Sequence, residues 1–287
     1  MDEDSQIQDL PCWSGPVTVE PLTGGITNRN FLVNDAGKKY VVRLGGDIPV
    51  HHVMRFNEHA ASRAAADAGI SPNVVYSAPG VLVIDFIEGK TADAAMVREH
   101  MDEIVDLVHR AHDEVTEHLR GPALSFWVFH VIRDYVAALR EAGNSSPDLQ
   151  DFLERADELE KAVGDVELVF AHNDLLAANF LNDGQRWWLI DWDYAGFNSP
   201  LFDLGGLASN NEFSEPEEKH MLERYFGQAA DPALWKQYQA MKTASLLRET
   251  LWSMVSEIHS KLDFDYKTYT RTNKQRFEQA WNGFKQS

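Results

Sequence analysis

One segment of the chain carries oxygen-bearing side chains between two short apolar runs. Asp174 and Asn179 follow the run 166–171, and Asp191 comes directly after the run 187–190. We therefore expect two buried strands that frame a loop of carboxylates and an amide. A carboxylate such as Asp174 can accept a hydroxyl proton, and Asn179 and Asp191 offer the hard oxygen ligands that Mg²⁺ prefers. These residue types at this spacing indicate chemistry on a metal-bound phosphate, and phosphoryl transfer is our working hypothesis.

A paired-glycine turn near the N-terminus is a candidate phosphate-binding loop. Three segments rich in β-branched or aromatic residues predict an antiparallel meander: 17–22, 27–33 and 39–44. The first turn contains Gly24 and Gly25, which allow the backbone to approach a ligand closely. Thr27 and Asn28 follow as short hydrogen-bonding side chains. A paired-glycine turn alone is more often an ordinary hairpin, so the assignment depends on the residues that follow.

A basic and an acidic residue beyond this turn form a second candidate pair. Period-two alternation in the third strand gives Arg43 a defined face of the sheet. Arginine stays protonated and can bind a phosphate and a carboxylate at once. Glu58, on a predicted helix over 51–69, is the candidate carboxylate that orients it. The plainer interpretations are a strand-edge arginine and a solvated surface glutamate.

The remaining pattern changes from strands to helices. Two more strands are expected over 73–77 and 81–86. Helices are then expected over six stretches: 91–117, 125–141, 147–163, 215–227, 232–260 and 266–284. Another helix is expected to begin near Pro200, nine positions after Asp191. This gap leaves little room for the long segment on which a protein acceptor docks, so we expect a small-molecule acceptor, with Asp203 bracing the catalytic loop.

Composition limits the classes of partner. The chain has 287 residues, is 44% hydrophobic and 25% charged, and carries a formal net charge of −19. Such acidity argues against a nucleic-acid partner or an anionic membrane surface, since both require clustered basic residues. The sequence contains no apolar run of about 18 residues, so we do not expect a membrane-spanning helix. The acidic N-terminus is unlike a signal peptide. With Cys12 as its only cysteine, the chain is expected to be a soluble cytoplasmic protein.

Six motifs in order resemble the choline/ethanolamine kinase family, within the aminoglycoside phosphotransferase-like group of protein-kinase-like enzymes. They are LTGGITNRNF, YVVRLGG, AHNDLLAAN, LIDWDYAG, FDLGGL and LWSMVSEIHSKLDFDY. The spacing H-x-D-x(4)-N within the third is that of kinase-like catalytic loops. The resemblance implies an α+β, bilobal fold. Residues 1–88 would form an N-lobe with a five-stranded antiparallel sheet and one helix, and residues 89–287 a mainly helical C-lobe.

The resemblance also implies roles in binding ATP and Mg²⁺. Asp174 would orient and deprotonate the acceptor hydroxyl, and Asn179 and Asp191 would hold Mg²⁺. The residues implied to bind ATP are Gly24, Gly25, Thr27, Asn28, Arg43 with Glu58 behind it, and the backbone near Asp85 and Ile87, which would meet the adenine edge.

On the acceptor side, the resemblance implies a pocket for a cationic head group. Tyr194, Trp252 and Tyr266 match its aromatic positions, and Asp193 or Glu212 would supply negative charge. An aromatic stripe on a helix is otherwise usually core.

Leu176, two residues after Asp174, departs from the polar residue of eukaryotic members. This departure leaves room for a smaller or different amino alcohol. Another class of acceptor is a separate alternative: an aminoglycoside, thiamine or a sugar. A catalytically silent nucleotide-binding protein is a further alternative, and the oligomeric state is not indicated.

Overall fold

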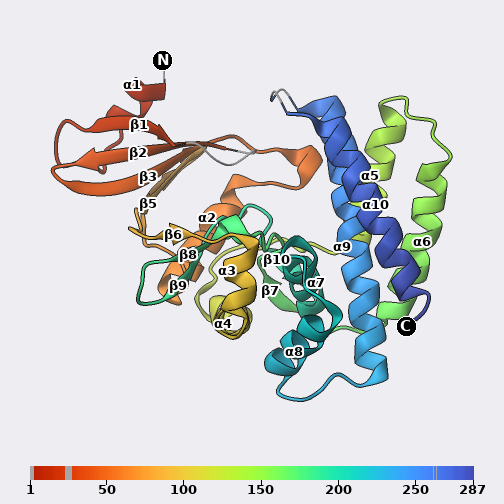
Figure 1. The fold of residues 1–287 in the computed structure, drawn as a ribbon. Helices are drawn as coiled ribbons and strands as arrows, with labels where there is room; N and C mark the ends of the chain where they lie inside the picture. The colour runs from red at the N-terminus through yellow and green to blue at the C-terminus, as the bar shows by residue number, and fades with distance from the viewer. Residues whose placement is uncertain (1–2, 23–27, 261, 263) are drawn as a thin grey trace.

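An antiparallel sheet of five strands forms the N-terminal part of the molecule (Figure 1). In the computed structural model, which describes residues 3–22, 28–260, 262 and 264–287, its strands are β1 (Thr18–Leu22), β2 (Arg29–Asp35), β3 (Lys38–Leu44), β4 (Val74–Ala78) and β5 (Val81–Asp85). They lie in the order β1-β2-β3-β5-β4. Because side chains alternate along a strand, Val33, Val42 and Val83 are buried together. The α+β class and the five-stranded sheet are confirmed, and a short helix, α1 (Glu3–Gln8), is an addition that packs Ile7 into the same core.

The helix that carries Glu58 begins later than expected. α2 spans Arg55–Asp67, and a single turn, η1 (Pro49–His51), precedes it. The expected start at residue 51 is wrong because His52 has a left-handed backbone with φ 62°, which a continuous helix does not allow. Alanines on the inner side of α2 are small enough to pack closely against α4 (Met101–His118).

The C-terminal part is mainly helical (Figure 1). Besides α4 it contains α3 (Ala94–Glu99), α5 (Val128–Glu141), α6 (Asp148–Val163), α7 (Pro200–Asn210), α8 (Glu215–Phe226), α9 (Pro232–His259) and α10 (Tyr266–Phe284). The single helix expected over 91–117 is wrong, because the backbone leaves the helical conformation at His100, with φ −109° and ψ 31°. Val97 and Ile104 are both fully buried, so the apolar pattern continues across this break.

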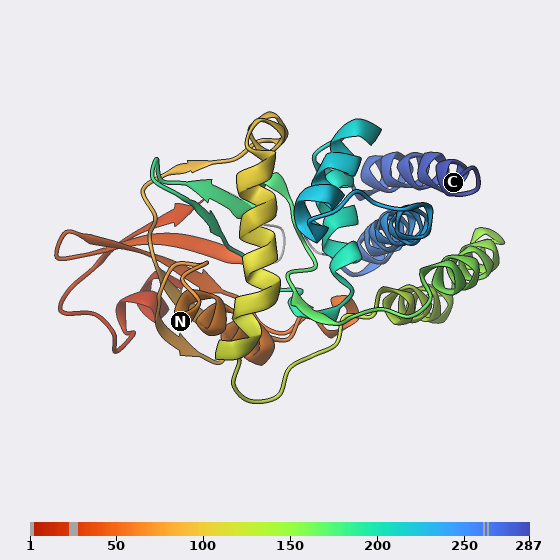
Figure 2. The same cartoon turned by 90° about the horizontal axis from the view of Figure 1, so that it is seen from below.

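The long helix α9 is the central support of the helical part. It packs against α5, α6, α7 and α10, and its apolar stripe of Leu247, Leu251 and Val255 is fully buried. Figure 2 shows α4 standing between the sheet on one side and these helices on the other. Residues of β2, β3 and β5 line one side of a cleft between the two parts, and residues of α9 line the other.

Short strand pairs fix the ends of the segment that carries Asp174 and Asp191. β7 (Val169–Ala171) pairs with β10 (Gly196–Asn198), and β8 (Phe180–Asn182) pairs with both β6 (Lys90–Thr91) and β9 (Trp187–Leu189). The predicted lobe boundary, 88/89, falls just before β6. A Cβ on Gly89 would lie 2.6 Å from the Asn182 carbonyl oxygen, so only glycine allows this close crossing.

Within the described residues, no helix is both long and apolar enough to span a membrane.

Candidate active site

The candidate catalytic loop, residues 172–179, begins at the end of β7 and is held by α7. Asp203 on α7 accepts hydrogen bonds from the backbone N–H groups of His172, at 2.8 Å, and Asn173, at 2.7 Å. His112 of α4 adds a side-chain contact at 2.9 Å. Burial opposes ionisation of Asp203, but these donors outweigh it and lower the pKa of its carboxyl group. A buried carboxylate therefore fixes the backbone immediately before Asp174.

The side chain of Asp174 faces the cleft without a fixed partner. Its carboxylate makes no hydrogen bond with any described residue, while its backbone oxygen accepts one from Asn179 Nδ2 at 2.8 Å. Burial raises the pKa of Asp174 to about 8. The positive charge of Arg248 opposes this shift, and the negative charge of Glu249 adds to it. Asp174 thus has the position and the unpaired oxygens of a proton acceptor.

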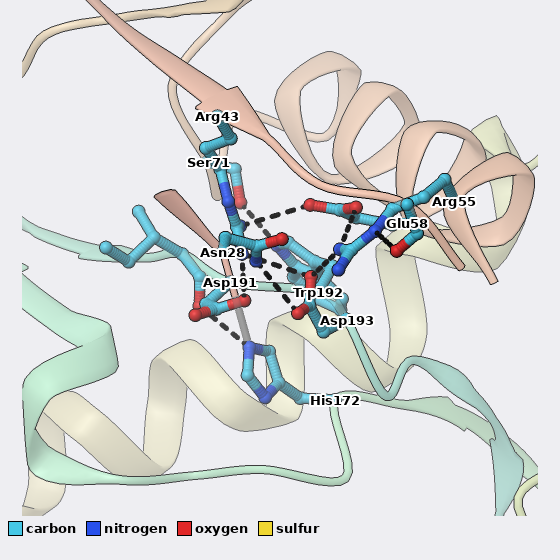
Figure 3. Close-up of polar contacts among 11 residues, drawn as sticks. Asn28, Arg43, Arg55, Glu58, Ser71, His172, Asp191, Trp192 and Asp193 are labelled. Carbon is cyan, nitrogen blue, oxygen red and sulfur yellow. Dashed lines mark hydrogen bonds and ion pairs between the residues drawn. The ribbon is translucent and has the colours of Figure 1, made fainter. Parts of the chain in front are cut away.

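Asp191 lies at a sharp turn after β9 and contacts the sheet across the cleft. Its backbone is left-handed, with φ 71°. Arg43 Nη2 on β3 donates to Asp191 Oδ1 at 2.7 Å and to Asp193 Oδ1 at 3.0 Å (Figure 3). Arg43 Nη1 also forms an ion pair with Glu58 Oε1 at 3.3 Å. The expected pairing of Arg43 with Glu58 is present, and it extends to both aspartates.

A second arginine, which the sequence reasoning missed, completes this cluster. Arg55 Nη1 donates to Glu58 Oε2 at 2.6 Å and to Asp193 Oδ1 at 2.9 Å (Figure 3). Asn28 Nδ2 donates to Asp193 Oδ2 at 3.0 Å. Burial raises the pKa of Glu58, although both arginines oppose the shift. The cluster ties the sheet and α2 to the segment that carries Asp191.

Two side-chain oxygens in the cleft remain available as ligands for Mg²⁺ held together with phosphates. Asn179 uses its Nδ2 in the loop, and its Oδ1 accepts no hydrogen bond from a described residue. The second carboxylate oxygen of Asp191 is likewise not engaged by Arg43. In the described part of the chain, no group of three or more His, Cys, Asp or Glu side chains forms a complete metal site. The available oxygens of Asn179 and Asp191 fit Mg²⁺, which binds through one or two protein oxygens plus substrate phosphates and water.

A cleft of about 520 Å³ joins these groups to an apolar slot under the sheet. The slot lies beside the close crossing at Gly89 and is lined by Val41, Ile84, Phe86 and Ile87. An apolar slot of this kind suits a flat aromatic base. Asp85 also lies here and pairs with Lys38. Gly24, Gly25 and Thr27, which were predicted to bind phosphate, lie outside the described residues.

The other end of the cleft has an aromatic wall. Tyr194, Trp252 and Tyr269 line it, and Trp252 Nε1 donates to the Tyr194 hydroxyl at 2.9 Å. Tyr266 is not on the wall: its ring packs behind Trp252 at 6.2 Å between centroids, and its hydroxyl meets Ser260 Oγ at 2.9 Å. Leu176 lies at the mouth of the cleft and is 40% exposed.

The two acidic residues expected beside the acceptor do not play that part in the structure. Glu212 is exposed just after α7, with φ 56°, and lines a different cavity next to α10. The turn into α8 directs the Glu212 side chain toward that cavity. Asp193 lines the cleft, but Arg43, Arg55 and Asn28 bind both of its carboxylate oxygens and it is only 3% exposed, so an amine has no access to it.

Glu249 is the acidic side chain that reaches the aromatic wall. It accepts hydrogen bonds from the Tyr269 hydroxyl at 2.7 Å and from Arg248 Nη1 at 2.8 Å. The sequence carried a signal for it, because Glu249 precedes Trp252 by three residues and so shares its helix face.

Comparison with known proteins gives a consistent result. Residues 18–241 match the Phosphotransferase enzyme family. The chain is 27% identical to the protein LicA of Haemophilus influenzae, with 85% of this chain and 75% of LicA covered. It is 25% identical to a probable choline kinase 1 of Arabidopsis thaliana, with 92% of this chain and 86% of the relative covered.

A solved structure supports the same relationship. The crystal structure of a choline/ethanolamine kinase family protein from Mesorhizobium loti is 27% identical, covers 96% of this chain and 92% of its own, and has a TM-score of 0.79. The resemblance and the kinase-like fold expected from the sequence are thereby confirmed.

Proposed function

The chain belongs to the phosphotransferase enzyme family, and we propose that it transfers the γ-phosphoryl group of ATP, with Mg²⁺, to the hydroxyl of an amino alcohol such as choline or ethanolamine. The names of relatives such as the probable choline kinase 1 and the probable ethanolamine kinase of Arabidopsis thaliana support this acceptor class. The observation that carries the proposal is the unpaired carboxylate of Asp174, which lies between the Arg43–Asp191 cluster and an aromatic wall with an acidic neighbour.

The reaction assigned to these residues is an in-line displacement. The acceptor oxygen forms a bond to the γ-phosphorus, the bond from that phosphorus to the β–γ bridging oxygen breaks, and the hydroxyl proton passes to Asp174. Arg43 stabilises charge on the phosphates. Asn179 and Asp191 would hold Mg²⁺, which supplies further neutralisation of phosphate charge when bound.

The aromatic wall and Glu249 orient the acceptor. A cationic amine is attracted to aromatic faces and to a carboxylate, and the cleft places both near Asp174. A bound amine therefore brings its hydroxyl, two carbons away, toward the proton acceptor. Positioning of this kind accounts for much of the rate enhancement in phosphoryl transfer.

Replacing the proposed proton acceptor tests the function directly. We expect Asp174→Asn to lower kcat at least about 100-fold with choline or ethanolamine, because general-base catalysis typically contributes that much. Mg·ATP binding, measured by calorimetry, should stay within about threefold. Asp183→Asn, on an exposed turn after β8, is the matched control and should retain full activity. Undiminished turnover by Asp174→Asn would refute the assigned base, and failure of every amino alcohol to stimulate ATP turnover would refute the acceptor class.

A further inference from the structure

A buried arginine already occupies part of the acceptor end of the cleft. Arg248 on α9 is 4% exposed. Its guanidinium carbon lies 4.6 Å from the ring centroid of Tyr194 and 5.3 Å from that of Phe126. Tyr194 belongs to the aromatic wall of the cleft, and Phe126 packs against Tyr194 at 5.9 Å between ring centroids. The protein's own cation therefore already contacts one ring of the wall.

The hydrogen bonding of Arg248 is incomplete. Nη1 donates to Glu249 at 2.8 Å, whereas Nε and Nη2 are buried and have no partner among the described residues. Nε and Nη2 lie on one edge of the planar guanidinium, and this edge binds carboxylates and phosphates through two parallel hydrogen bonds. Two buried, charged donors left unpaired are unfavourable. An oxyanion is the ligand that would pair both at once.

Arg248 lies between the cleft and a small polar cavity beside Asp174. The small cavity has a volume of about 20 Å³, and Asp174, Arg248 and Glu249 line both spaces. An oxyanion bound to Arg248 would therefore lie next to the proposed proton acceptor and at the end of the cleft where the aromatic wall stands.

Glu249 gives this region the opposite charge as well. Its side chain is 21% exposed, and it already receives hydrogen bonds from Arg248 and Tyr269. A carboxylate next to an arginine presents one negative and one positive group at adjacent positions on α9. A ligand with an ammonium and an oxyanion a few bonds apart complements this pair.

We propose that the acceptor is an amino alcohol that also carries a carboxylate, a hydroxy amino acid, and that Arg248 binds this carboxylate while Glu249 binds the amine. The inference rests on the proposed function, since the hydroxyl of the same molecule attacks ATP beside Asp174. It narrows the acceptor from amino alcohols in general to zwitterionic ones.

Matched acceptor pairs test the proposal. Serine and ethanolamine differ by one carboxylate, as do homoserine and 3-aminopropanol. With the full-length protein, ATP and Mg²⁺, we expect kcat/KM to be about tenfold or more higher for the carboxylate member of at least one pair, mainly through a lower KM. In Arg248→Met this ratio should fall to about one. Arg248→Lys, which keeps the charge but not the paired donors, should give an intermediate ratio.

A neighbouring variant separates the two charges. Glu249→Gln should weaken both members of a pair alike and leave their ratio unchanged, because both contain the amine. Calorimetry with Mg·ATP verifies that each variant is folded. A wild-type preference for ethanolamine or choline over every carboxylate acceptor would overturn the inference while leaving the proposed function intact. An equal fall in kcat for all acceptors in Arg248→Met would also overturn it, because Arg248 would then act on the transferred phosphoryl group.

Discussion

The surroundings of Asp174 determine the pH range in which its carboxylate can act as a base. Its proposed role requires the ionised carboxylate, yet burial raises its pKa to about 8. Arg248 favours the charged form and Glu249 disfavours it. Two adjacent residues of α9 therefore influence the same carboxylate in opposite directions, and each effect has a predictable sign.

The pH dependence of catalysis follows from this balance. A raised pKa means that Asp174 is protonated at low pH and becomes a base as pH rises through about 8. We expect kcat/KM to increase with pH as one proton is lost, with a midpoint near that value. Glu249→Gln removes a nearby negative charge, so its midpoint should be lower. Glu154→Gln, an exposed change on the outer helix α6, should leave the midpoint in place. A pH-independent kcat/KM between pH 6 and 9, or an upward shift in Glu249→Gln, would contradict the assignment.

Some residues of the candidate site could be predicted from the sequence, whereas two buried arginines could not. Asp174, Asn179 and Asp191 have a recognisable spacing and lie on or beside short apolar strands. Arg55 and Arg248 have no such pattern, because an arginine on a helix is usually exposed and its burial depends on partners far away in sequence. Asp193, the partner of Arg55, is 138 residues away. Glu212 was expected in the pocket from the family resemblance, but it lies just after α7 and lines a different cavity.

At the scale of elements, α4 and α7 hold the catalytic loop through one carboxylate. Asp203 binds two loop N–H groups and His112, and His112 Nδ1 also contacts the Tyr225 hydroxyl at 2.7 Å. The bracing position of Asp203 could be anticipated from the sequence. Its link through His112 could not, because the two residues are 91 positions apart.

Removing this brace should affect both stability and turnover. Asp203→Ala leaves two backbone donors and His112 buried without their acceptor, so we expect the free energy of unfolding to fall by about 3 kcal/mol or more. Any variant that remains folded should also lose kcat, since the backbone before Asp174 is no longer fixed. Urea unfolding measures the first effect. Asp113→Ala, which removes only an exposed partner of His109, should change stability by less than about 1 kcal/mol. Equal losses in the two variants would argue against the brace.

Helix boundaries were predictable only where a strong local signal exists. α10 was expected over 266–284 and spans Tyr266–Phe284, with Asp265 capping its first turn. The break at His100 was missed because apolar residues on either side of it still face one core. Hydrophobic periodicity indicates which side of a helix is buried, and a single non-helical residue hardly alters the spacing of the apolar residues.

At the scale of the whole molecule, two of the contacts that join the sheet and α2 to the rest of the chain contain buried ionisable groups. One is the charged cluster of Arg43 and Arg55 with Asp191 and Asp193. The other is uncharged: His51, in the turn before α2, contacts Tyr135 of α5 and both Ser256 and Trp252 of α9. With a net charge of −19, the chain places two of its arginines at this junction, where they offset carboxylates that would otherwise repel one another.

His51 makes this second contact sensitive to pH. Its Nδ1 lies 3.3 Å from the Tyr135 hydroxyl, its Nε2 lies 3.1 Å from Ser256 Oγ, and its ring is 5.2 Å from that of Trp252. Burial, aided by the charge of Arg248, lowers the pKa of His51 to about 3. Folding therefore keeps the ring neutral at pH values where an unfolded chain, with an ordinary histidine pKa of about 6.5, would protonate it.

The low pKa of His51 predicts that the free energy of unfolding falls on acidification. Because the folded-state pKa is below the unfolded one, the contribution of His51 is complete above about pH 6.5 and is lost as the pH falls from there toward 3. One proton corresponds to a slope of at most about 1.4 kcal/mol per pH unit. Urea unfolding of wild type and His51→Gln between pH 7.5 and 4.5 should give curves that converge at low pH, since glutamine has no proton to gain. Parallel curves would contradict this, because they would mean that His51 gains its proton as readily in the folded protein as in the unfolded chain.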